Sequence, residues 1–172
     1  RMIKNGYLFK NANYSYIPTY TAPGHASIYT GCTPSQHGIV ANEWYDESFK
    51  VTRYCVSDKR FNSVGVATEE GEMSPKNMLV TTIGDELKLS NNNHSKVISI
   101  ALKDRSAILP GGHKADAAYW IDKQGKWITS SYYMKTLPSW VEEMNKSRPG
   151  KFYLGSKWEP IFPLMEYEES FS

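Results

Sequence analysis

Residues 97–102 read Val97-Ile98-Ser99-Ile100-Ala101-Leu102, a largely apolar run of strand length. A run of this kind is typical of a strand that is buried in a parallel sheet. A helix is predicted just before it, over residues 75–89. A helix followed by a buried strand is half of a βαβ unit, so the sequence predicts an α/β fold.

The helix predicted over residues 75–89 has a recognisable start and end. Ser74 is a good capping residue, and Pro75 suits the first helical turn. Three asparagines at positions 91–93 end the helix. Its apolar side chains recur at roughly helical spacing; they are Met78, Leu79, Ile83, Leu87 and Leu89.

The rest of the chain predicts short elements. Strands are expected over residues 7–9, 14–16 and 50–56, helices over 21–30 and 138–146, and loops over 33–38 and 61–71. Two segments, 117–121 and 126–130, flank Asp122-Lys123-Gln124-Gly125, which indicates a hairpin with a glycine turn. Irregular chain is expected after residue 147, with any domain boundary near 147–150.

Composition excludes several classes of protein. The chain has 172 residues, 40% hydrophobic and 22% charged, which suits one domain with a core. Its net charge of +2 and its lack of long Lys/Arg runs argue against nucleic-acid binding. No apolar stretch approaches the ~20 residues of a membrane span. The first six residues resemble the last turn of a helix closed by Gly6, so we expect a piece of a longer chain.

The two cysteines, Cys32 and Cys55, are too few for a disulfide framework or a zinc–cysteine site. They could pair with each other in an oxidising compartment, or both could be free thiols. The cysteine count therefore leaves the compartment open.

Thr21 stands where a chain broken by Pro23 and Gly24 turns into a short apolar helix that ends at Gly31. The start of a helix offers unpaired N–H groups and a partial positive charge, which favour an anion and help to ionise a nearby hydroxyl. A nucleophile is well placed there to attack a phosphoryl or sulfuryl centre. The alternative is that Thr21 merely caps the helix.

Lys103 and Arg105 follow the apolar strand directly, at the end where open α/β sheets bind their ligands. In an extended chain, residues two apart point the same way, so the two cations would form an anion clamp. The alternative is a solvated junction whose charge Asp104 neutralises.

Three segments carry a family resemblance: PTYTAPGHASIYTG (18–31), GIVANEWYD (38–46) and LKDRSAILPGGH (102–113). Together they closely resemble the alkaline phosphatase superfamily, and most of all the bacterial, periplasmic PafA-type phosphate monoesterases. These are near neighbours of the nucleotide pyrophosphatase/phosphodiesterases. The resemblance runs in order across essentially the whole chain.

The resemblance implies the N-terminal part of an alkaline phosphatase-like sandwich, with a mostly parallel sheet flanked by helices and an inserted hairpin or cap. A core of roughly 1–115 and a cap-like excursion of roughly 116–172 would make up an incomplete catalytic domain. It also implies a periplasmic or secreted protein that acts on small phosphate esters.

The resemblance assigns roles to four residues. Thr21 matches the nucleophile, which lies between two zinc ions and becomes a covalent phosphothreonine. Asn42 matches the asparagine that donates to a non-bridging phosphoryl oxygen, and Lys103 and Arg105 match the pair that contacts the remaining oxygens in monoesterases. Trp44 could line the substrate pocket or pack in the core.

The zinc ligands of the family fall outside these residues, apart from the Thr21 hydroxyl. No histidine matches one of them; the four are His25, His37, His94 and His113. We interpret His25 as structural, hydrogen-bonding its loop, and the pairing of His113 with Asp116 as accidental. The chain alone is therefore expected to hold no zinc and to be inactive. The alternatives are a phosphodiesterase or nucleotide pyrophosphatase of the same superfamily, and a non-catalytic anion-binding homologue.

Overall fold

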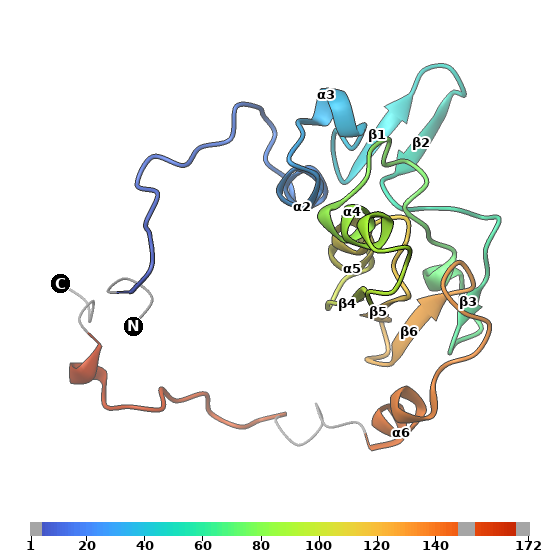
Figure 1. Ribbon diagram of the computed structural model, residues 1–172. Coiled ribbons are helices and arrows are strands. Elements are labelled where there is room, and N and C mark those ends of the chain that lie inside the picture. Colours follow the sequence, from blue (N-terminus) through green and yellow to red (C-terminus); the bar gives the residue numbers. More distant parts are fainter. Residues whose placement is uncertain (1–4, 148–153, 168–172) are drawn as a thin grey trace.

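The computed structural model describes residues 5–147 and 154–167 (Figure 1). Helices and strands gather in one packed body over about 21–147, and the segments 5–20 and 154–167 extend away from it. None of the helices in these described ranges combines the length and the apolar character that crossing a bilayer requires.

A four-stranded sheet forms the centre of the body, in the order β3 (Ser63–Val64), β6 (Trp127–Ser130), β5 (Ala117–Ile121) and β4 (Ile98–Ile100). β4 and β5 are parallel, whereas β5–β6 and β3–β6 are antiparallel. The α/β class is confirmed. The expectation of a mostly parallel sheet is wrong for the described residues, because the β5–β6 hairpin turns the chain back at Gly125, which has φ +80°.

The strand predicted over 97–102 is confirmed as β4 and pairs in parallel, but it is not buried. Ile98 and Ile100 remain 59% and 56% exposed. The reason is that Ile100 pairs with Tyr119 on the face of the sheet that carries α6 (Ser139–Ser147), and α6 packs over β5 and β6 more than over β4.

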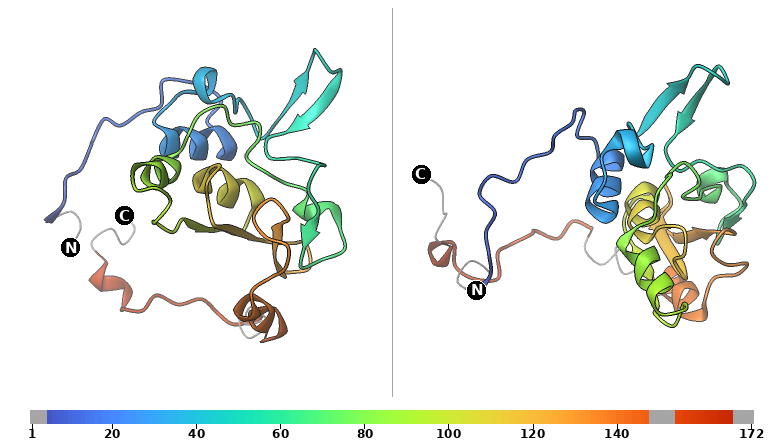
Figure 2. Two further views of the ribbon diagram at one scale, coloured as in Figure 1. Left: turned by 45° about the vertical axis from the view of Figure 1, so that its right-hand side comes forward. Right: turned by 45° about the horizontal axis from the view of Figure 1, so that its top comes forward.

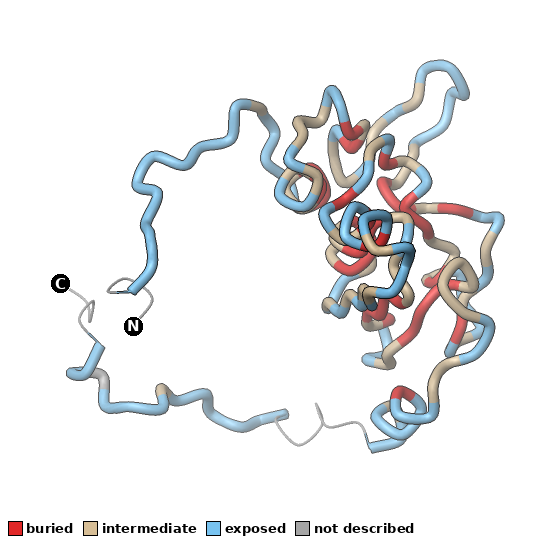
Figure 3. Tube along the Cα trace, viewed as in Figure 1, coloured by how far each residue is buried: buried red, intermediate tan, exposed pale blue. Residues whose placement is uncertain are grey.

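Helices lie on both faces of the sheet. From β5, Ala118 and Trp120 join a core cluster with residues of α2 (Thr21–Thr30) and α5 (Asp104–Gly111). Tyr119 points the other way and packs with Val141 of α6. The alternation of strand side chains thus produces a helix–sheet–helix sandwich. Figure 3 shows buried residues concentrated where these layers meet.

One predicted helix starts later than expected. α4 runs over Ile83–Ser90, not from residue 75. The Ser74 hydroxyl donates to Asp58 Oδ2 at 2.6 Å and accepts the Lys76 N–H at 3.2 Å, so it closes a turn at residues 76–77 that does not continue as a helix. Thr82 and Asp85 form a capping box instead, and this pair sets the start of the helix.

Of the other helices, strands and loops predicted from the sequence, some are confirmed and some are wrong. The helix over 21–30, the strand within 50–56, the 117–130 hairpin and the helix near 138–146 are confirmed. Residues 7–9 and 14–16 are not strands, because this exposed arm has no neighbouring strand to pair with in the described chain. The expected loops contain α3 (Pro34–His37), β3 and the 3₁₀ turn η1 (Glu69–Gly71). Residues 1–4 of the expected terminal helix lie outside the described residues.

A second, two-stranded sheet projects from the body (Figure 2). Its strands β1 (Glu43–Asp46) and β2 (Val51–Tyr54) pair in antiparallel fashion, with Glu43 opposite Tyr54. The Cys55 N–H donates to the Asn42 carbonyl at 3.0 Å and closes the base of this hairpin. The division into a core of 1–115 and a cap beyond it stays a prediction; β5 and β6, which follow residue 115, share the sheet with β4.

Candidate functional site

Thr21 is the first residue of α2, and its side chain is exposed. The capping position belongs to extended Tyr20, which makes no side-chain capping bond. The Thr21 hydroxyl makes no hydrogen bond with residues 5–147 or 154–167. The structure therefore does not support the alternative that Thr21 is only a helix cap.

Asn42 reaches the same end of α2. Its Oδ1 accepts a hydrogen bond from the Ala22 N–H at 2.9 Å, next to Thr21. An asparagine amide has one acceptor oxygen and one NH₂ donor group. With the oxygen committed to Ala22, the NH₂ group is the part of Asn42 that can bind an anion near Thr21.

Lys103 and Arg105 come together in a way that the sequence did not predict. Lys103 is extended, at φ −120° and ψ 145°, and caps α5, whereas Arg105 lies in the first helical turn. The expected two-residue extended clamp is therefore wrong, because the helix begins at Asp104. Both cations nevertheless line one open cavity of about 470 Å³.

Arg105 is not a solvated surface charge. Its side chain is only 15% exposed. Its Nη1 donates to the Tyr54 hydroxyl at 2.7 Å, and that hydroxyl donates to Asp104 Oδ1 at 2.7 Å. The Nε of Arg105 is buried and has no partner among the described residues. An unpaired buried donor on a charged group is costly, and the Arg105 side chain lines the cavity, so an anion bound there would offset part of that cost.

α2 and α5 pack against each other, but the lining of the cavity at Lys103 and Arg105 includes neither Thr21 nor Asn42. His25, one turn along α2 from Thr21, is half-buried. Burial lowers the pKa of His25, and the charge of Arg105 lowers it further. The prediction that His25 hydrogen-bonds its loop is wrong, since its ring makes no hydrogen bond within the described ranges.

His37 and His94 make hydrogen bonds within the fold. His37 is fully buried; its Nε2 bonds Ser27 Oγ at 3.0 Å and its Nδ1 accepts from the Ile39 N–H at 3.1 Å. His94 Nδ1 lies 2.6 Å from the Asn91 carbonyl oxygen.

Asp116 is engaged by lysines rather than by His113. Its Oδ2 accepts from Lys88 Nζ at 2.8 Å, and its Oδ1 accepts from Lys96 Nζ at 3.3 Å. Burial acts to raise the pKa of Asp116, but the bonds from Lys88, from the Val97 N–H and from Lys96 lower it to about 2. This supports the interpretation that His113 and Asp116 do not form a ligand pair.

The described residues do not fit a complete metal site. They contain no cluster of three or more histidine, cysteine, aspartate or glutamate side chains able to hold a metal ion. Thr21 could contribute one hydroxyl at most. Whether the chain alone takes up zinc stays a prediction.

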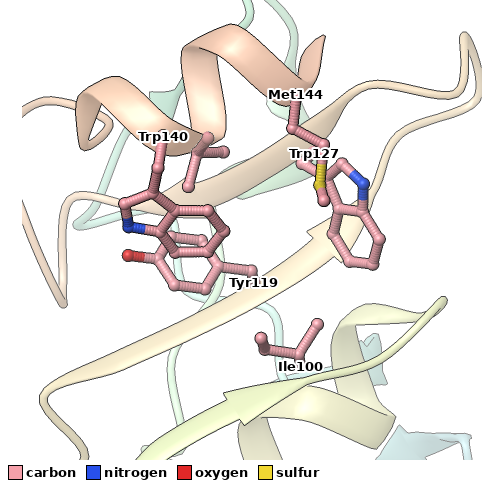
Figure 4. A pocket seen from close by; sticks show the side chains of 6 residues that line it. Ile100, Tyr119, Trp127, Trp140 and Met144 are labelled. Carbon is pink, nitrogen blue, oxygen red and sulfur yellow. The ribbon is translucent and has the colours of Figure 1, made fainter. Parts of the chain in front are cut away.

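A separate pocket of about 90 Å³ lies between α6 and the sheet (Figure 4). Trp140 and Met144 reach from α6 toward Tyr119, Trp127 and Ile100. This lining offers no charged side chain, so the pocket is unsuited to a phosphate group. The phosphate-binding candidate is the cavity at Arg105.

Trp44 and the cysteines have simple structural surroundings. Trp44 is half-buried and packs against the core cluster, which supports the packing alternative; a role in the substrate pocket stays a prediction. Cys32 and Cys55 are both free thiols. Burial and the charge of Asp104 raise the pKa of Cys55 to about 12.

Comparison with known proteins identifies the chain. The type I phosphodiesterase/nucleotide pyrophosphatase family matches residues 1–169. The chain belongs to this family. It is 47% identical over 171 residues to alkaline phosphatase PhoV of Synechococcus elongatus, covering 99% of this chain and 31% of that protein. It is 43% identical over 172 residues to alkaline phosphatase PafA of Elizabethkingia meningoseptica, covering 99% and 32%.

Solved structures agree with the sequence relatives. The crystal structure of wild-type PafA matches with a TM-score of 0.82 at 43% identity, over 91% of this chain and 31% of that chain. A PafA variant in which one threonine, one asparagine, one lysine and one arginine are replaced matches equally well, at 41% identity. The expected family and the N-terminal part of the alkaline phosphatase fold are confirmed. The chain spans about a third of the length of the curated relatives it matches.

The sequence alone did not identify Tyr54 and Asp104 as site residues. Tyr54 ends a strand that was predicted, but no motif marks it, and its partners lie about 50 positions away. Asp104 was interpreted only as a neutralising charge. Both roles depend on how the β1–β2 hairpin meets α5, which a single sequence does not specify.

Proposed function

We propose that the full-length protein hydrolyses phosphate monoesters and that Thr21 is its nucleophile. The Thr21 Oγ would attack phosphorus, the ester oxygen would leave as an alcohol, and water would then release phosphate from the phosphothreonine. One arrangement carries the proposal: an unpartnered Thr21 hydroxyl beside Asn42, at the start of a helix that packs against α5, which carries Arg105.

Each neighbouring group has a role that fits the charge on a phosphoryl group. The Asn42 NH₂, the Lys103 ammonium and the Arg105 guanidinium would be donors for the three non-bridging oxygens. Fixed donors on these oxygens stabilise the charge that is shared among them in the transition state. A monoester dianion carries one charge more than a diester, so two cations favour the monoester.

The relatives support this assignment by the spacing of their residues. In the PafA variant the replaced threonine and asparagine are 21 positions apart, and the replaced lysine and arginine are two apart. Thr21 and Asn42 are also 42 − 21 = 21 positions apart, and Lys103 and Arg105 are 105 − 103 = 2 apart.

The proposal includes zinc, as the family resemblance implies. Bound zinc would lower the pKa of an attacking hydroxyl and stabilise developing negative charge. The described residues supply no complete site for it, so its ligands would come from outside this chain.

Replacement of Thr21 tests the proposal in the full-length protein. Thr21→Ala should reduce turnover of phenyl phosphate to background, and Thr21→Ser should retain part of it because a hydroxyl remains. Thr30→Ala is the matched control, since Thr30 ends the same helix and its hydroxyl bonds only backbone groups, the Ala26 carbonyl and the Cys32 N–H. Turnover by Thr21→Ala at the rate of Thr30→Ala would refute the assignment.

Phosphodiester or pyrophosphate hydrolysis is the second candidate, because the matching family is described by those activities. The rates on phenyl phosphate and on its phenyl diester distinguish the two. A faster rate on the diester would favour the second candidate and would argue against a clamp made by Lys103 and Arg105.

A further inference from the structure

Tyr54 links the two halves of the proposed site. It is the last residue of β2, and across the hairpin it faces Glu43, the neighbour of Asn42. Asn42 contacts the start of α2 through Ala22, and Tyr54 contacts the start of α5 through Asp104 and Arg105. The base of one hairpin therefore touches both helix ends that carry the phosphate-binding groups.

The directions of the hydrogen bonds at Tyr54 follow from the chemistry of its two partners, the Arg105 guanidinium and the Asp104 carboxylate. A guanidinium only donates and a carboxylate only accepts. The Tyr54 hydroxyl must therefore accept from Arg105 Nη1 and give its proton to Asp104 Oδ1, both at 2.7 Å. Burial raises the pKa of Tyr54, and the charge of Asp104 raises it further, so the hydroxyl keeps this proton at neutral pH.

The direct ion pair is weak by comparison. Arg105 Nη1 and Asp104 Oδ1 are 4.0 Å apart, at the limit for such a pair. Asp104 also accepts the Arg105 N–H at 2.6 Å, which fixes the carboxylate at the start of α5. The hydroxyl of Tyr54 is thus the group that ties the end of the arginine side chain to this fixed carboxylate.

We propose that Tyr54 is a positioning residue for Arg105: its hydroxyl holds Nη1 and so fixes the guanidinium at the cavity that Lys103 also lines. The proposal rests on the proposed function and assigns to it a residue outside the phosphate contacts. Without the hydroxyl, the guanidinium would sample several orientations, and binding of the phosphoryl group would have to order it each time.

Tyr54→Phe in the full-length protein is the test, with Tyr133→Phe as the matched control. Each change removes one buried hydroxyl, but that of Tyr133 has no hydrogen-bond partner among the described residues. Tyr54→Phe should lower kcat/KM for phenyl phosphate by about tenfold, the loss expected for one hydrogen bond to a charged group. The inhibition constant of inorganic phosphate should rise by a similar factor. Tyr133→Phe should change neither quantity.

A double-mutant cycle separates positioning from general structure. In an Arg105→Ala background, Tyr54→Phe should cause no further loss, because the group that it positions is gone. A tenfold loss in both backgrounds, or equal values for Tyr54→Phe and Tyr133→Phe, would overturn the proposal. Thermal unfolding of each variant shows whether it is folded.

The failure of this proposal can be told from the failure of the proposed function. If the wild-type protein hydrolyses phenyl phosphate and Tyr54→Phe behaves like the wild type, only the positioning role is wrong. If the wild-type protein does not hydrolyse the ester and inorganic phosphate does not bind, both proposals are wrong.

Discussion

The side-chain oxygen of Asn42 accepts a hydrogen bond from the backbone N–H of Ala22, at 2.9 Å. This bond satisfies one of the free amides at the start of α2 and uses the oxygen of the Asn42 amide, so that its NH₂ group is left to donate elsewhere. The β1–β2 hairpin, which follows Asn42, is thereby attached to the helix that begins with Thr21. This one hydrogen bond therefore orients the Asn42 NH₂ donor and joins the β1–β2 hairpin to α2.

Two substitutions at Asn42 separate these effects. Asn42→Asp keeps an acceptor for Ala22 but replaces the NH₂ donor by a negative charge, whereas Asn42→Ala removes both. Both should lower kcat for phenyl phosphate by about 100-fold or more, the cost of one lost donor to a developing oxyanion. Only Asn42→Ala should also lower the unfolding temperature. An active Asn42→Asp variant would contradict the assigned donor role.

The cation pair should matter more for monoesters than for diesters. Lys103→Ala combined with Arg105→Ala removes both positive side chains from the cavity that they line. We expect a loss of at least about 100-fold in kcat/KM for phenyl phosphate, with a much smaller loss for the phenyl diester. Lys123→Ala, at the exposed rim of the same cavity, is the control. Equal losses on both esters would defeat the clamp assignment.

The metal prediction concerns the chain by itself. The 172-residue chain should contain substoichiometric zinc after dialysis and show no phosphatase turnover, since its described residues lack a three-ligand cluster. Elemental analysis and an assay with added zinc check both points. In the full-length protein a chelator should abolish activity. Zinc-dependent turnover by the chain alone would contradict the prediction.

Much of the fold was predictable because local signals agreed with the tertiary structure. The apolar run at 97–102 and the glycine turn at Gly125 correctly predicted a parallel strand and a hairpin. The start of α4 was not predictable from Ser74, because the turn that Ser74 closes stops at residue 77 and the capping box of Thr82 and Asp85 begins the helix. The exposure of Ile98 and Ile100 on β4 depends on which element covers their face of the sheet, and local sequence does not encode that.

The candidate site was predictable only in its residue types. Thr21, Asn42, Lys103 and Arg105 were found through motifs, and the helix start at Thr21 followed from Pro23 and Gly24. The contacts that these residues make were not predictable, because each contact depends on how α2, α5 and the hairpin pack together. Tyr54 is the clearest case, since nothing in its own neighbourhood distinguishes it from other strand tyrosines.

The buried His37 should make stability depend on pH. Burial lowers its pKa from the ordinary value of 6.5, and its Nδ1 must stay unprotonated to accept the Ile39 N–H. As the pH falls below 6.5, the unfolded state binds the proton first, so stability is complete above that value and is lost below it. The slope is at most about 1.4 kcal/mol per pH unit.

Denaturant unfolding between pH 8 and pH 5 measures this dependence in the full-length protein. His37→Asn should be less stable than the wild type at pH 8, and the difference should shrink toward pH 5. His94→Asn changes an exposed histidine and should keep the wild-type slope. A constant difference between His37→Asn and the wild type across this range would contradict the role of His37.

The open edge of β4 should drive association of the isolated chain. An apolar edge strand with free backbone groups can pair with the same edge of another molecule, and lysine on such an edge opposes pairing. Ile98 on β4 and Ile28 on α2 are 59% and 64% exposed, so they offer matched sites for one substitution. Ile98→Lys should reduce concentration-dependent association in light scattering, whereas Ile28→Lys should reduce it much less, because a helix surface has no free ladder groups. Equal effects of the two lysines would show that exposed apolar area, and not the strand edge, causes the association.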